Sequence, residues 1–262
     1  LYNIVDRIYI GHISGVGAAA LTGVGLFTPI LMLINAFAML AGSGGAPRAA
    51  ISMGKKDNKT AEKILGNCFA LLILMAVILT VVFFTFAPQL LTLFGASEKT
   101  LPYGVAYARI YILGSIFVLI VMGMNPFITT QGFAKISMMT TVIGAVINII
   151  LDPIFIFVFH LGVKGAALAT VLSQAVGAIW ILRFLSGKKT ILHLKKENFK
   201  LQKEIILPCL ALGISTFVML STESILSISF TSSLSRYGGD LAVGAMTIIT
   251  SVSQLATLPL QG

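Results

Sequence analysis

The stretch ILGNCFALLILMAVILTVVFFTFAP, residues 64–88, decides the fold because it carries no charged residue over a length that can cross a lipid bilayer. About 20 mostly apolar residues in a helix span the roughly 30 Å hydrocarbon core. The rest of the chain is similar: 57% of its 262 residues are hydrophobic, only 10% are charged, and the mean hydropathy is +0.98. Soluble domains carry about 25% charged residues, so soluble enzyme folds and disorder are excluded. The sequence predicts an all-α polytopic membrane protein.

Uncharged runs between the charged residues predict eight membrane-spanning helices, of which the first and the last are incomplete. They cover residues 1–13, 18–46, 64–88, 103–129, 136–159, 165–185, 205–230 and 241–262. The alternation of polar and apolar residues that marks a β-barrel strand is missing from these runs. We expect the chain to be truncated at both ends, because it starts at Leu1 and stops at Gly262 within an apolar run.

The basic residues predict the orientation of these helices. Thirteen Lys and Arg residues follow the second, fourth and sixth spans, whereas only three lie in the opposite gaps. By the positive-inside rule the basic gaps and the N-terminal side of the chain are cytoplasmic, as in a multi-pass protein of the cell (inner) membrane. Because the basic residues are confined to gaps and form no stripe, we expect the lipid bilayer and no nucleic acid as a partner. Residues 186–203, the longest polar stretch, are predicted to form a linker between the helical regions 1–185 and 204–262.

Three of the nine acidic residues, Asp6, Asp152 and Glu223, fall inside predicted spans. A charge at the bilayer centre costs about 2.5–3.5 kcal/mol on insertion scales, so such residues usually face a bundle interior or an aqueous cavity and mark function. The alternative is a neutral, hydrogen-bonded carboxyl group that helps two helices to pack. Three such residues together favour the functional interpretation.

Asn148 and Asp152 are four residues apart and therefore share one face of a helix. Pro153 has no N–H group, so the carbonyl group of Ile149 loses its helical partner. This pattern predicts a polar cavity beside Asp152. Two other pairs, Thr28-Pro29 and Asn125-Pro126, place a polar residue before a proline and predict broken helices of the kind found in transporter cores.

The span over residues 165–185 presents small residues at a spacing of four, which permits close helix contact. They are Gly165, Ala169, Ser173 and Gly177. Thr170 and Gln174 lie on the adjacent stripe, where they either bond to neighbouring helices or line a site. Cys68 and Cys209 are far apart in sequence and suggest neither a disulfide framework nor a metal site.

Four motifs in this order resemble those of the multidrug and toxic compound extrusion (MATE) transporters. They are VDRIYIG at residues 5–11, the glycine-rich residues 42–48, NIILDP at residues 148–153, and GAALAT at residues 165–170. The resemblance covers nearly the whole chain. It implies a MATE-like helical bundle with two lobes of six helices, of which this chain would hold the N-lobe, its first helix incomplete, and the first two helices of the C-lobe.

The resemblance also implies a function, which is antiport of amphipathic, often cationic compounds against Na⁺ or H⁺ rather than enzymatic catalysis. The cation or proton site, including a Na⁺ site, would use Asp6, Asn148, Asp152 and Thr170. Asn125 matches a helix-four position where some relatives carry an acid, which leaves the ion preference open. Glu223, Tyr107 and Gln174 are candidates for a substrate or proton site. No cofactor is expected beyond the coupling ion, and the full-length protein is expected to be monomeric.

Two other functions fit parts of the pattern. A flippase for lipid-linked precursors, from the same superfamily, would share the architecture but needs several basic residues within its spans to hold pyrophosphate, and only Arg7 and Arg109 are available. An intramembrane aspartyl protease would use Asp6 and Asp152 as an acid and base pair. Its Tyr-Asp and Gly-x-Gly-Asp motifs are absent, since Val5 precedes Asp6 and Leu151 precedes Asp152.

Overall fold

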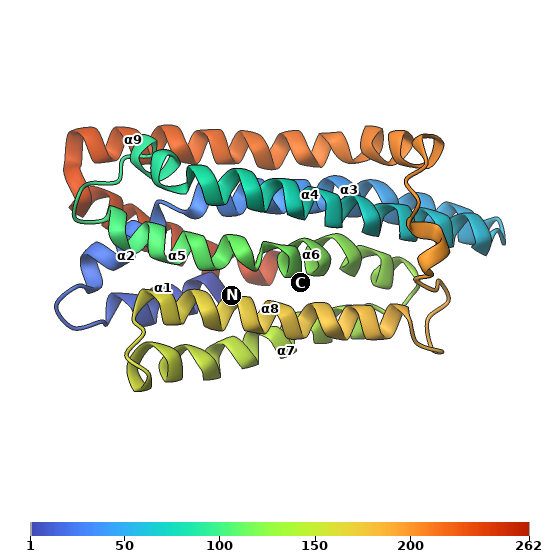
Figure 1. Ribbon diagram of the computed structural model, residues 1–262, viewed down its shortest axis with the longest axis horizontal. Helices are drawn as coiled ribbons and strands as arrows, with labels where there is room; N and C mark the ends of the chain where they lie inside the picture. The colour runs from blue at the N-terminus through green and yellow to red at the C-terminus, as the bar shows by residue number, and fades with distance from the viewer. Residues whose placement is uncertain (1, 262) are drawn as a thin grey trace.

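The computed structural model describes the backbone of residues 2–261 and the side chains of residues 4–253 (Figure 1). The described part of the chain contains helices and no strand, so the all-α prediction is confirmed. The α-helices are α1 (Tyr2–Gly11), α2 (Gly17–Gly25), α3 (Thr28–Gly54), α4 (Asn58–Leu93), α5 (Leu101–Leu113), α6 (Ser115–Thr130), α7 (Ala134–Pro153), α8 (Val163–Leu185) and α9 (Lys203–Gln261). A π-helix, η1 (Ile154–Val158), extends α7, and a 3₁₀ turn, η2 (Lys196–Phe199), precedes α9.

Five helical segments are long and apolar enough to cross a membrane, and the bent pair of α5 and α6 makes a sixth. The last of the five, Lys203–Ser253, contains two helical limbs, because Gly239 adopts a left-handed conformation (φ 65°, ψ −168°) that reverses the chain. Figure 1 shows the second limb of α9 returning along the bundle from this turn. The prediction of several membrane spans is therefore confirmed for the described residues.

Two of the three predicted helix breaks lie where the prolines placed them. The span over residues 18–46 is divided between α2 and α3, with Pro29 in the first turn of α3. After Pro153 the chain widens into the π-helix η1, which lies next to Asp152.

The predicted break at Asn125-Pro126 was wrong, because α6 continues through Pro126. The span bends instead by 56° at Gly114, between α5 and α6. A side-chain carbon at Gly114 would collide with Val171 of α8, so the absence of a side chain permits close contact at this bend.

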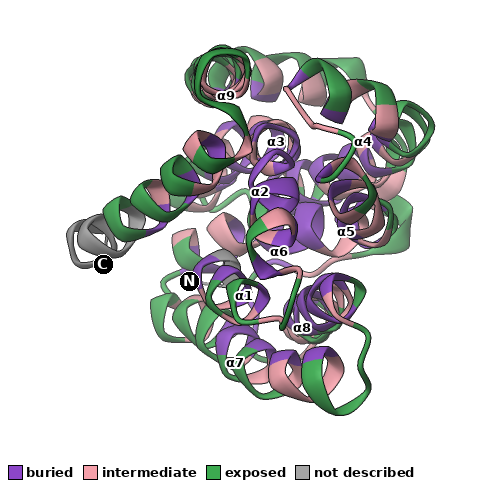
Figure 2. Ribbon diagram, turned by 90° about the vertical axis from the view of Figure 1, so that its left-hand side faces the viewer, coloured by how far each residue is buried: buried purple, intermediate pink, exposed green. Residues whose placement is uncertain are grey.

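Small residues let the helices approach each other in the core. The predicted stripe on α8, from Gly165 to Gly177, is buried along its length, and a Cβ atom at Gly165 would collide with the backbone of Phe155. Figure 2 shows buried residues gathered on α2, α3 and α6 in the middle of the bundle. Large apolar side chains on the outer faces of α4 and α9, such as Val81 and Leu207, are exposed, as expected for surfaces in contact with lipid.

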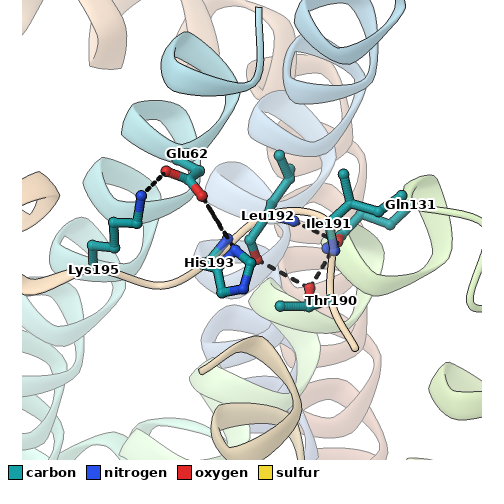
Figure 3. A network of polar contacts seen from close by, with 7 residues as sticks. All are labelled: Glu62, Gln131, Thr190, Ile191, Leu192, His193 and Lys195. Atoms are coloured by element: carbon teal, nitrogen blue, oxygen red, sulfur yellow. Dashed lines mark hydrogen bonds and ion pairs between the residues drawn. The ribbon is translucent and has the colours of Figure 1, made fainter. Parts of the chain in front are cut away.

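The polar stretch between α8 and α9 is bound to the other helices rather than free. Figure 3 shows Gln131, at the end of α6, close to the backbone of Thr190, Ile191 and Leu192. The Oε1 atom of Gln131 accepts hydrogen bonds from the Thr190 hydroxyl group at 2.8 Å and from the N–H groups of Ile191 and Leu192 at 2.9 Å each. One amide oxygen thus fixes three consecutive residues of this stretch.

Two side chains of α4 bind the rest of the stretch. Glu62 accepts bonds from the His193 N–H group at 3.1 Å and from the Lys195 ammonium group at 2.7 Å (Figure 3). The hydrogen bond to the Glu62 carboxylate raises the pKa of Lys195. Further along, the Oδ1 atom of Asn67 accepts a bond of 2.7 Å from the N–H group of Gln202, one residue before α9 begins. The whole stretch is therefore anchored to α4 and α6.

Candidate functional site

Asp6 of α1 is completely buried and accepts hydrogen bonds from three helices. Its Oδ2 atom accepts bonds from the Thr170 hydroxyl group at 2.7 Å and the Tyr107 hydroxyl group at 3.0 Å. Its Oδ1 atom accepts a bond from the amide nitrogen of Asn148 at 3.1 Å. These contacts join α1 to α5, α7 and α8 around one carboxyl group.

Asn148 connects the two acidic residues of the site. Its amide nitrogen donates to Asp6 and also to the Oδ1 atom of Asp152 at 3.2 Å. The spacing of four residues places Asn148 and Asp152 on one face of α7, as the sequence predicts. We call Asp6, Tyr107, Asn148, Asp152 and Thr170 the carboxylate cluster, and all five side chains are at most 1% exposed.

The local sequence explains why α7 can present these groups. Pro153 ends the regular hydrogen bonding of α7, and the π-helix that follows leaves the helix wider next to Asp152. Opposite, the Thr170 hydroxyl group lies within reach of both Asp6 and the carbonyl oxygen of Ala166, which is 3.1 Å away. A hydroxyl group has one hydrogen, so the bond of 2.7 Å to Asp6 competes with the bond within the helix.

The carboxylate cluster offers oxygen atoms to a hard cation or a proton. Among the described residues, the Oδ1 atom of Asn148 and the Oδ2 atom of Asp152 are buried without a hydrogen-bond partner. Unsatisfied buried acceptors are costly, and a bound cation or an added proton would satisfy them. Two adjacent ionised carboxylates also repel each other, which a positive charge offsets. Carboxylate, amide and hydroxyl oxygens suit a cation such as Na⁺.

Asn125 and Gln174 lie elsewhere. Both line a pocket of about 540 Å³ between α3, α6, α7 and α8, together with Met39, Met122 and Pro47. The Asn125 amide nitrogen donates to the carbonyl oxygen of Ser137 at 3.4 Å, while its buried Oδ1 atom has no partner among the described residues. The structure does not join these two residues to the carboxylate cluster by any described hydrogen bond.

Glu223 is also separate from the carboxylate cluster. Its side chain lies on an exposed face of α9. In the part of the chain with described side chains, Glu223 forms no ion pair, whereas the ion pairs that do occur belong to Glu62. The acidic character of this residue within a predicted span therefore does not by itself place it in the site.

The sequence analysis missed two features that the fold brings together. Arg7 was set aside as a residue near a span end, yet it is only 6% exposed and donates to Thr28 at 2.7 Å and to Ser251 at 2.9 Å. Its position inside the predicted first span was the available signal. Cys68 of α4 and Cys209 of α9 hydrogen-bond to each other, and their separation in sequence concealed this contact.

The chain is similar to known transporters over its whole length. The MatE family model matches residues 1–154. The multidrug export protein MepA of Staphylococcus haemolyticus is 28% identical over 262 residues, which are 100% of this chain and 57% of MepA. The chain thus spans little more than half the length of this curated relative.

Two solved structures share the fold closely. One is an inward-facing multidrug resistance MATE family transporter of the MOP superfamily, with a TM-score of 0.92 and 28% identity over 98% of this chain and 58% of that protein. The other is the MATE multidrug transporter DinF-BH in complex with rhodamine 6G, with a TM-score of 0.91 and 32% identity over 99% of this chain and 58% of that protein. Since the MatE model matches more than half of the residues, this chain belongs to the MATE family of transporters.

Proposed function

We propose that the protein acts in secondary antiport, exporting amphipathic, often cationic compounds in exchange for Na⁺ or H⁺. The observation that carries the proposal is the completely buried pair of carboxyl groups, Asp6 and Asp152, linked by the amide group of Asn148. A buried acidic pair is costly in a membrane protein that needs only packing, and it suits a site that exchanges positive charge. The export functions in the names of MepA and of the DinF-BH complex support this interpretation.

The coupling follows from where the carboxylate cluster lies. It joins α1 to α7 beside Pro153 and the π-helix, which is a place where a helix can bend. When Na⁺ or H⁺ occupies the cluster, the repulsion between Asp6 and Asp152 is removed and the two helices can adopt a different relative position. The ion and the exported compound then influence each other if each prefers a different one of these two states.

A compound would meet a mostly apolar surface. The pocket of about 540 Å³ near Asn125 and Gln174 combines methionine and proline side chains with two amide groups. Ligand pockets of this kind bind amphipathic molecules through apolar contact and orient them with a few polar groups. We assign Asn125 and Gln174 to this compound, together with Tyr107, which could respond to the state of Asp6.

The membrane arrangement is part of the proposal. The N-terminal side is cytoplasmic in a cell membrane, residues 1–185 form the N-lobe, residues 186–203 the cytoplasmic linker, and residues 204–262 the start of the C-lobe. The basic gaps support this orientation through the positive-inside rule. The working transporter is monomeric, with the coupling ion as its only inorganic partner.

The test is ethidium efflux from cells that express the complete gene encoding this chain, with Na⁺ and pH gradients collapsed separately. Asp152→Asn keeps the size of the side chain but removes its charge, so we expect it to insert normally and to abolish gradient-driven efflux. Glu98→Gln is the matched control, because Glu98 is exposed in a loop outside the cluster. Wild-type efflux by the Asp152→Asn variant would refute the proposal, and the gradient that drives the wild type identifies the ion.

A flippase for lipid-linked precursors is less well supported. Pyrophosphate recognition requires several converging cations. Of the two arginines in predicted spans, Arg7 is buried near the C-terminal limb of α9, whereas Arg109 is exposed and lies 5.7 Å from the ring centroid of Phe84. The two arginines therefore do not share a site in the described part of the chain.

A further inference from the structure

Arg7 is a buried cation whose charge no described ion pair neutralises. Two groups accept hydrogen bonds from it, the hydroxyls of Thr28 on α3 and Ser251 on the second limb of α9. A guanidinium group has five N–H donors, so these two bonds leave donors available. Hydroxyl groups satisfy hydrogen bonds without compensating a positive charge. A buried charge of this kind is costly unless an anion accompanies it.

Asp6, the next residue in sequence, does not bond to Arg7 through any described contact. Its two carboxyl oxygens are directed at Tyr107, Asn148 and Thr170, on the inner side of α1. Adjacent residues on a helix point about 100° apart, which separates the two side chains. Asp6 therefore lowers the cost of the nearby positive charge without occupying the donors of Arg7.

Arg7 lines a cavity of about 200 Å³ between α1, the start of α3 and both limbs of α9. Among the residues with described side chains, the cavity wall contains no acidic one. Its other polar side chains are hydroxyl groups that can donate hydrogen bonds: Thr28, Ser227, Thr231, Thr247 and Thr250. Met32, Phe230 and similar apolar residues form the rest. One cation and several donors in an apolar wall match an oxyanion attached to an apolar body.

A second pocket touches the other side of Arg7. It has a volume of about 460 Å³, is mostly apolar, and lies between α1, α2 and the second limb of α9. Arg7 and His12 are its basic residues, and the described part of its wall also contains no acidic residue. The space on both sides of Arg7 thus has the same polarity, which is opposite to that of the carboxylate cluster.

We propose that Arg7 and the hydroxyl groups around it bind the carboxylate or sulfonate group of an amphipathic small molecule between α1 and α9. A cavity of about 200 Å³ is smaller than typical drug sites, so it suits the acidic end of a molecule whose apolar body extends outside it. The inference rests on the proposed transport function in naming a class of cargo, namely compounds that carry an acidic group. A purely structural Arg7, which only ties α1 to Thr28 and Ser251, is the competing explanation.

Two dyes separate these explanations, because rhodamine 6G is the ethyl ester of rhodamine 19. They share the cationic ring system, and only rhodamine 19 carries a free carboxylate. Binding to the purified protein, expressed from its complete gene, is measured by fluorescence anisotropy. Arg7→Gln is expected to weaken rhodamine 19 binding by about ten-fold, as for loss of a charged hydrogen bond, and to change rhodamine 6G binding by less than about two-fold.

The control variant is Arg109→Gln, which removes an exposed arginine and is expected to leave both dyes unaffected. Arg7→Lys keeps the charge and is expected to retain part of the preference for the acid. An equal loss of both dyes in Arg7→Gln, or no loss of either, overturns the proposal.

A wild-type measurement covers the case in which Arg7→Gln fails to fold. Benzenesulfonate at constant ionic strength is expected to displace rhodamine 19 and to leave rhodamine 6G bound, and displacement of neither dye or of both equally overturns the proposal. Efflux is measured separately in cells. Selective binding of the acid without efflux of any dye would refute the transport function and leave the Arg7 site intact.

Discussion

The hydroxyl group of Thr170 donates to the Oδ2 atom of Asp6 over 2.7 Å and so connects α8 to α1 inside the carboxylate cluster. Thr170→Val preserves the shape of the side chain but removes this donor. We expect a ten-fold or greater shift in the ion concentration that half-saturates efflux, since hydrogen bonds to charged groups contribute about 1.5–3 kcal/mol. Thr170→Ser, which retains the hydroxyl group, should shift it much less. Equal half-saturation in all three proteins would contradict this role.

The contact between Cys68 and Cys209 allows a test of the packing of α4 against α9 without engineered residues. Diamide should oxidise the two thiols to a disulfide and itself be reduced to the hydrazine. Peptide mass mapping under non-reducing conditions should then find the two cysteines linked, and Cys209→Ser should abolish the linked peptide. Failure to form the link at full reaction of both thiols would show that the two helices do not adopt this arrangement in the membrane.

Glycines set the distance between α3 and α9. A Cβ atom at Gly44 would collide with the carbonyl oxygen of Cys209, and one at Gly213 would collide with that of Leu40. Gly213→Val should therefore lower the stability of the purified protein by about 1–3 kcal/mol, which is the usual cost of overpacking. Thermal unfolding in detergent measures the change. Gly54→Ala, where no atom lies within 4 Å of the added carbon, should leave the melting temperature nearly unchanged.

Glu62 holds the stretch before α9 through its bonds to His193 and Lys195. Glu62→Gln should release this stretch and increase the rate of trypsin cleavage after Lys195 and its basic neighbours in inside-out vesicles. Glu204→Gln, a change at an exposed acid nearby, should not affect cleavage. Unchanged cleavage in Glu62→Gln would mean that Gln131 and Asn67 anchor the stretch without it.

The same ion pair has a defined pH dependence. The pKa of Lys195 is raised by Glu62, so the folded protein binds this proton more tightly than the unfolded chain. The stabilisation is therefore fully present below the ordinary lysine pKa and is lost only as the pH rises through the raised value. Trypsin sensitivity of the wild type should stay constant from pH 7 to pH 9, whereas a rise across that range would contradict the ion pair.

The sequence predicted most of the fold, because charge is so costly in a bilayer that the uncharged runs outline the helices. It also predicted that Asn148 and Asp152 share a face, which depends only on helical periodicity. The location of the bend at Gly114 could not be predicted, since it depends on contact with Val171 of another helix. Proline at residue 126 gave the more obvious local signal.

The site was harder to predict than the helices. Four residues of the carboxylate cluster were proposed together from the family resemblance, and the fold places them in contact. Tyr107, proposed for substrate or proton binding, joins them through Asp6. The role of Glu223 could not be judged from its type alone, because whether an acid in a span faces the interior depends on the packing of α9. The contacts of Arg7 with Thr28 and Ser251 likewise join positions distant in sequence.

The anchoring of Gln202 to Asn67 places a pivot at the base of α9. Only one residue boundary separates the anchored backbone from the first turn of a helix that runs straight to the turn at Gly239. At about 1.5 Å per residue this limb is roughly 50 Å long, so a rotation of about 10° at its base would move the far end by roughly 9 Å. The limb therefore acts as a lever: a small rotation next to α4 is enough to open or close the opposite end of the bundle.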